Sequence, residues 1–142
     1  MNLQVIKEQL LKMGESIGLK VNEETAEMIS VDSQITAKDY FKSAVYLRVV
    51  VYSSGTLHMF LTFNQIEKTS DNLFLINNFN AENPWFKAYI ANIGNKDYLE
   101  LHYATFALTD DGQPADVVNY LLNQLLTEDI LKNLNPILNA CK

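Results

Sequence analysis

Two successive segments of the chain place an apolar side chain at every second position. These are residues 44–52 and 57–63, and the residues between them read Ser53-Ser54-Gly55. Alternation with a period of two is typical of a strand with one buried face, and a short turn between two such segments predicts a β-hairpin. The residues expected in the core are Val45, Leu47, Val49, Val51, Leu57, Met59, Leu61 and Phe63.

A second hairpin is expected further along the chain. Residues 86–90 and 99–105 alternate in the same way, and Gly94-Asn95 supplies a turn between them. Residues 26–31 form a weaker candidate strand, followed by a polar connection over residues 32–42.

The spacing of apolar residues changes to three and four in three other segments, which predicts amphipathic helices. The first covers residues 3–17 and ends at Gly18. The second begins with Ser70 as its N-cap and runs to about residue 80, before Pro84. The third is long, from Pro114 to residue 137, and residues 127–129 or Pro136 could divide it into two helices.

The expected element order is therefore α-β-β-β-α-β-β-α within one domain, residues 1–142. Strands arranged as hairpins and separated from the helices indicate the α+β class. We expect an antiparallel sheet of about five strands with helices on one face.

Charge and composition exclude some classes of partner. The chain has 142 residues, with 11 basic against 17 acidic residues, and a net charge of −6. Nucleic acids and anionic membranes attract basic proteins, so neither is an expected partner. No segment approaches the ~20 apolar residues of a membrane helix. Cys141 is the only cysteine, which fits a reducing, cytoplasmic location.

The sequence offers little catalytic chemistry. The five glycines form no phosphate-binding loop, and each adjacent pair of carboxylates suits a turn or a helix start better than a cleft. His58 and His102 would meet if their strands were neighbours, and Glu100 shares their face, so a metal-ligand set can be imagined. The simpler interpretation is two surface imidazoles. We therefore expect no enzyme activity and no cofactor.

The second face of the expected sheet is rich in aromatic residues, although such a face is usually polar. Aromatic side chains serve interfaces well, but they also favour strands for local reasons. Trp85 could belong to the core or to a dimer contact. The candidate partner-binding residues are Tyr46, Arg48, His58, Phe60, Trp85, Tyr89, His102 and Phe106.

Residues 77–90, which read Asn-Asn-Phe-Asn-Ala-Glu-Asn-Pro-Trp-Phe-Lys-Ala-Tyr-Ile, resemble the central part of the YbjN-like family. The turn at 93–96 and the strand at 97–101 extend this resemblance. The element order of the whole chain is similar to the type III secretion chaperone-like fold. The resemblance implies a small, acidic, cytoplasmic and often dimeric protein, without a catalytic residue set. Secretion chaperones of this fold hold an extended client along hydrophobic patches.

Three functions follow as hypotheses. The first is a non-enzymatic protein-binding module, chaperone-like or adaptor-like, which forms a homodimer and holds a client polypeptide on sheet and helix surfaces. The second is a regulatory or sensory protein that binds a small ligand. The third is a metal-dependent enzyme using His58, His102 and Glu100.

Overall fold

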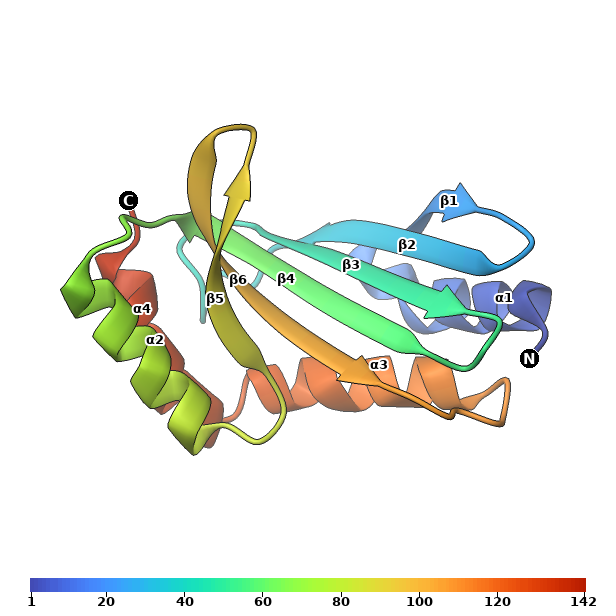
Figure 1. The fold of residues 1–142 in the computed structure, drawn as a ribbon. Coiled ribbons are helices and arrows are strands. Elements are labelled where there is room, and N and C mark those ends of the chain that lie inside the picture. Colours follow the sequence, from blue (N-terminus) through green and yellow to red (C-terminus); the bar gives the residue numbers. More distant parts are fainter.

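The structure is a computed structural model that describes residues 1–142. It has one six-stranded sheet and four α-helices (Figure 1). In chain order the elements are α1 (Leu3–Met13), a 3-10 turn (Glu15–Ile17), β1 (Lys20–Glu24), β2 (Met28–Ile35), β3 (Val45–Tyr52), β4 (Leu57–Gln65), α2 (Ser70–Glu82), β5 (Lys87–Ile93), β6 (Lys96–Thr105), α3 (Gln113–Leu125) and α4 (Glu128–Ala140). The α+β class and the antiparallel sheet are confirmed.

All neighbouring strands are antiparallel, in the order β1-β2-β3-β4-β6-β5. Both predicted hairpins are present, as β3–β4 and β5–β6. The second turns through Gly94 and Asn95, which both have positive φ, a conformation that favours these two residue types. Only the β4–β6 pair joins strands that are not consecutive in the sequence. Along the chain, α2 and β5 lie between these two strands.

The sheet has one strand more than predicted. β1 was not expected because all five of its residues are exposed and only Val21 is apolar, so its sequence carries no alternation. The strand expected at residues 26–31 is β2, which continues to Ile35 into the segment predicted as a connection. Asp32 and Gln34 look like loop residues, but they alternate with buried or half-buried neighbours.

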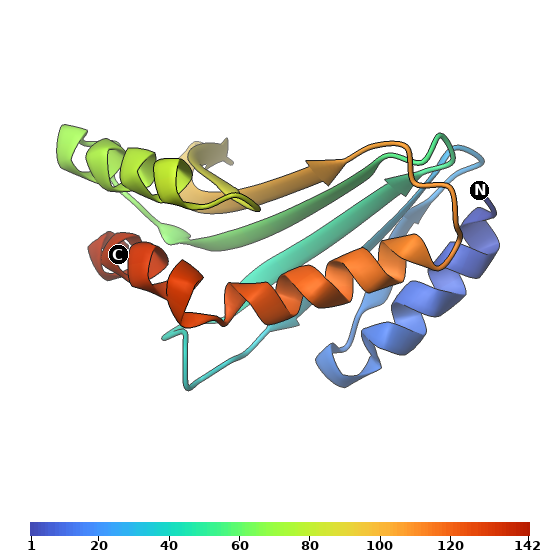
Figure 2. The same ribbon diagram turned by 90° about the horizontal axis from the view of Figure 1, so that it is seen from below.

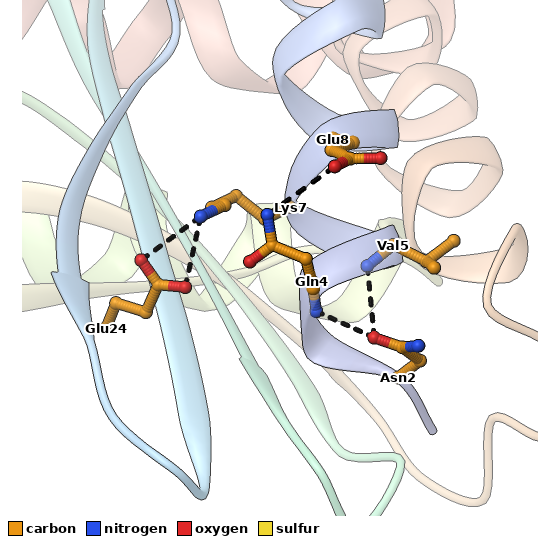
Figure 3. Close-up of polar contacts among 6 residues, drawn as sticks. All are labelled: Asn2, Gln4, Val5, Lys7, Glu8 and Glu24. Carbon is orange, nitrogen blue, oxygen red and sulfur yellow. Dashed lines mark hydrogen bonds and ion pairs between the residues drawn. The ribbon is translucent and has the colours of Figure 1, made fainter.

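The N-terminal helix is fixed at its start and tied to β1. The Asn2 side chain accepts hydrogen bonds from the backbone N–H groups of Gln4 and Val5, at 3.0 and 3.3 Å. On the other side of the helix, Lys7 Nζ lies 3.1 Å from a carboxylate oxygen of Glu24 (Figure 3). The helix predicted over residues 3–17 ends earlier, because α1 stops at Met13 and a separate 3-10 turn follows Gly14. Gly18 is left-handed, as expected, and ends this turn.

The helices were expected on one face of the sheet, but they do not all lie there. α1 and α3 lie side by side beneath the sheet, whereas α2 stacks on α4 at one end and flanks the edge strand β5 (Figure 2). The N-cap of α2 is Thr69 rather than Ser70, since the Thr69 hydroxyl oxygen accepts from Asn72 N at 3.2 Å. The predicted C-terminal helix is two helices, and the second begins after Thr127.

The core lies between the sheet and the helices below it. It contains 28 buried residues, and all eight strand residues predicted for it are among them. α3 contributes Val118 and Leu121, and α4 contributes Leu134 and Ile137. None of the helices is long and apolar enough to span a membrane.

Candidate functional site

The face of the sheet opposite the core is not covered by any helix (Figure 1). We call it the open face. The strand registers place alternate residues of β3, β4, β5 and β6 on this face, and Phe60 is among them. The residues of the open face that matter below are Tyr46, Arg48, Tyr52, His58, Phe60, Thr62, Lys87, Tyr89, Tyr98, Glu100 and His102.

Four rings of the open face form a ladder across three strands. Tyr52 meets His58 edge-on, with ring centroids 6.2 Å apart. His58, Phe60 and His102 lie with nearly parallel rings, and their centroids are 4.6 to 6.0 Å apart. His58, Phe60 and His102 are half-buried and Tyr52 is exposed, because no other element covers the ladder. It therefore presents a rigid aromatic surface to the solvent.

The two histidines are brought together, as the sequence allowed if their strands were neighbours. His58 Nδ1 and His102 Nε2 are 2.9 Å apart, a hydrogen-bond distance that requires one ring to donate and the other to accept. Burial, and then the positive charge of a protonated His58, lowers the pKa of His102. The lowered pKa favours the neutral form of His102 near neutral pH.

Arg48 is the central charged group of the open face. Its guanidinium donates to the Tyr46 hydroxyl at 2.9 Å and lies 3.7 Å from a carboxylate oxygen of Asp32. Tyr46 in turn donates to Asp32 and lies with its ring 5.6 Å from the guanidinium carbon. These contacts hold Arg48 over β3, yet its Nε is buried without a hydrogen-bond partner.

A hollow of about 510 Å³ opens on this face beside the tip of the β5–β6 hairpin. Phe60 and Thr62 of β4 lie opposite Arg48 and Tyr46 of β3 in the strand register. The hairpin tip projects away from the other strands (Figure 1). The residues lining the hollow are Tyr46, Arg48, Phe60, Thr62, Ile93, Tyr98 and Glu100.

Glu100 is the one buried charged residue in this hollow, with 8% of its surface exposed. Burial raises its pKa, against the opposing effects of a hydrogen bond with Tyr89 and of the charge on Arg48. Burial next to this carboxylate also raises the pKa of the Tyr89 hydroxyl. No cation lies within ion-pair distance of Glu100, so Tyr89 and the more distant charge of Arg48 compensate its charge only in part.

Six of the eight candidate partner-binding residues lie on the open face. Trp85 lies elsewhere, in the connection before β5, where its ring meets Tyr120 of α3 edge-on at 5.6 Å. Phe106 follows the last residue of β6 and is 69% exposed. The hollow adds Thr62 and Ile93, which were not predicted as site residues. The register places Thr62 opposite Glu100, and Ile93 reaches the hollow from the tip of the β5–β6 hairpin.

The imagined metal-ligand set is not assembled. His58 and His102 meet, but no group of three or more His, Cys, Asp or Glu side chains in the structure could hold a metal ion. In the register Glu100 lies opposite Thr62, and His102 lies opposite Phe60. The carboxylate therefore belongs to the hollow, and the imidazoles belong to the ladder.

No family model, curated protein or solved structure matches this chain. The YbjN-like resemblance consequently depends on residues 77–101 and on the order of the elements alone. The observed order has an added strand before α2 and an added helix at the C-terminus relative to the order predicted from the sequence.

Proposed function

We propose that this chain is a non-enzymatic binding protein that holds an extended segment of a client polypeptide across the open face. The observation that carries the proposal is the ladder of Tyr52, His58, Phe60 and His102 on a face that no helix covers. Rigid aromatic groups gain much binding energy when a partner displaces water from them, at a small cost in side-chain entropy.

The surroundings of the ladder suit a polypeptide. Arg48 and Glu100 offer opposite charges beside the aromatic rings, and the exposed Lys87 lies opposite His102 at the β5 side. Side chains of an extended segment alternate in direction, so one could enter the hollow while others lie on the rings. The YbjN-like resemblance, with its implied chaperone-like or adaptor-like role in the cytoplasm as a homodimer, agrees with this proposal.

The test is recovery of the client by affinity purification of the protein from its own cells. One polypeptide should be enriched repeatedly and retained at moderate salt. Phe60→Ala should weaken its binding about thirtyfold, the usual cost of removing a central aromatic contact. Phe74→Ala is the matched control, because Phe74 lies on α2, away from the open face, and is 64% exposed. Tyr46→Ala provides a second removal on the open face.

Phe60→Ala and Tyr46→Ala must keep the circular dichroism spectrum of the parent protein, since a folding defect would also reduce binding. Retention of the same polypeptide by Phe60→Ala and Tyr46→Ala at parent affinity would contradict the proposal. Equal losses in Phe60→Ala and Phe74→Ala would contradict it as well, because the open face would then have no special role.

A second candidate function is regulation through a small ligand, and the hollow is the observation that favours it. Its volume, about 510 Å³, lies within the ~300–1,000 Å³ range of small-molecule sites. A ligand that binds only the folded state raises the melting temperature by mass action. A thermal-shift screen tests this candidate, and a screen without any stabilising compound would count against it.

A further inference from the structure

The hollow holds two opposite charges that the protein leaves incompletely satisfied. Glu100 is buried and has no ion-pair partner, with only the Tyr89 hydroxyl beside its carboxyl group. Arg48 donates to Tyr46 and forms an ion pair with Asp32 at 3.7 Å, but its buried Nε has no hydrogen-bond partner. Buried charged and polar groups in folded proteins are usually paired, because the loss of hydration is costly. Both groups line the same hollow, yet they form no ion pair with each other.

The register explains why Arg48 and Glu100 stay apart. Arg48 lies opposite Phe60, whereas Glu100 lies opposite Thr62, so the two charges occupy diagonal corners of a three-strand block. The central strand β4 and a two-residue offset along the sheet separate them. Neighbouring strands are about 4.8 Å apart, so the backbones of β3 and β6 lie on the order of 10 Å apart, and both side chains line the hollow above β4.

The remaining walls of the hollow are mostly aromatic. Phe60, Tyr46 and Tyr98 supply three rings, and Ile93 adds an aliphatic contact from the hairpin tip. The faces of aromatic rings attract ammonium groups, most strongly where water is excluded. A buried carboxylate beside such rings is therefore suited to an organic ammonium group.

A ligand with a single charge suits this hollow poorly. A cation placed at Glu100 shares the space with Arg48, and an anion placed at Arg48 shares it with Glu100. Like charges brought together in a partly desolvated site repel each other. We propose that the hollow binds a small zwitterion, whose ammonium group lies against Glu100 and the rings and whose carboxylate or phosphate lies against Arg48. This inference depends on the second candidate function, the binding of a small ligand.

The experiment is a thermal-shift screen at about pH 7 with the common amino acids, glycine betaine and phosphocholine, followed by calorimetric titration of each stabilising compound. L-phenylalanine, phenethylamine and 3-phenylpropionate form a matched set, because they share the phenyl ring and carry both charges, only the cation or only the anion. The zwitterion of such a set should bind about tenfold or more tightly than either singly charged analogue.

Glu100→Gln and Arg48→Gln should each weaken binding of the same zwitterion about tenfold or more, because each removes one charge-assisted contact. Glu82→Gln is the control, since Glu82 is exposed at the end of α2 and should leave the affinity unchanged. Urea denaturation of each variant would show that the fold is retained.

The outcomes separate failure of this inference from failure of the small-ligand function. Zwitterions that bind with unchanged affinity to Glu100→Gln and to Arg48→Gln would overturn this inference and leave the small-ligand function standing. A singly charged analogue that binds as tightly as its zwitterion would also overturn the inference. A screen in which singly charged or neutral compounds stabilise the protein, but no zwitterion does, would have the same meaning. A screen without any stabilising compound would overturn both the inference and the second candidate function.

Discussion

The two faces of β4 differ in chemistry as much as in what covers them. Leu57, Met59 and Leu61 have no exposed surface and pack against the helices, whereas His58 and Phe60 alternate with them and remain half-buried on the open face. The solvated face of an antiparallel sheet is commonly polar, and the open face of β4 departs from this pattern. Burial of the covered face therefore supplies most of the stability from β4, and the open face remains available for binding.

The largest expected effect would come from the covered face. Leu61→Ala removes a fully buried side chain and should lower the free energy of unfolding by about 2–5 kcal/mol. Phe60→Ala, one residue away, should cost about 1 kcal/mol, since it loses mainly the stacking with its imidazole neighbours. Urea denaturation measures both. Equal losses in the free energy of unfolding would contradict the difference between the two faces, because the open face would then be part of the core.

The edge of the sheet is intermediate between the two faces. The Asn80 side chain accepts from Ala88 N at 2.6 Å and donates to Ala88 O at 2.9 Å, so it takes the place of a seventh strand at one position. Asn80→Ala should lower the free energy of unfolding by about 1–3 kcal/mol, because two partly buried backbone groups lose their partner. Asn77→Ala, at an exposed position of the same helix, should change it by less than about 0.5 kcal/mol.

Glu100 belongs to the open face and is nevertheless buried. Its raised pKa means that the folded state binds a proton more tightly than the unfolded state does. This contribution to stability is fully present below about pH 4.5, the ordinary value, and is lost as the pH rises toward the folded pKa. Glu100→Gln should therefore stabilise the protein at about pH 7 and have little effect at about pH 4. Stabilities of variant and parent that differ equally at both pH values would contradict this account.

The smallest effect is expected for the histidine pair. The pKa of His102 is lowered in the folded state, so its contribution to stability is present above about pH 6.5 and is lost as the pH falls through the folded pKa. His102→Gln should flatten the decline of the melting temperature between about pH 7 and pH 5. Glu100 opposes this decline over part of the range, so the double variant with Glu100→Gln should be measured as well. An unchanged pH profile in His102→Gln would exclude the pair as its cause.

The sequence predicted the strands whose apolar positions alternate strongly, which are β3, β4, β5 and β6. It failed for β1 because an edge strand without a buried residue has no pattern to detect. It also misplaced α2 relative to the sheet, since the position of a helix depends on contacts such as Asn80 with Ala88, which no periodicity reveals.

The candidate site was predicted in its composition rather than in its geometry. Alternation alone placed Tyr46, Arg48, His58, Phe60 and His102 on one face, and the structure agrees. The division of this face into a ladder and a hollow depends on the β4–β6 register, which pairs His102 with Phe60 and Glu100 with Thr62. Two strands separated by α2 and β5 in the sequence give no local signal of their register.

The pairing of β4 with β6 has a further consequence for how the protein assembles. It joins two parts of the chain whose other strand pairings are local, β1–β4 on one side and the β5–β6 hairpin on the other. Local pairings generally form faster than long-range ones, so we expect the β4–β6 pairing to form after the others. The hollow takes Arg48 and Phe60 from the first part and Ile93 and Glu100 from the second. Two fragments divided between β4 and α2 would each lack half of the hollow, so recovery of ligand binding on mixing would report that the two parts had found their native register.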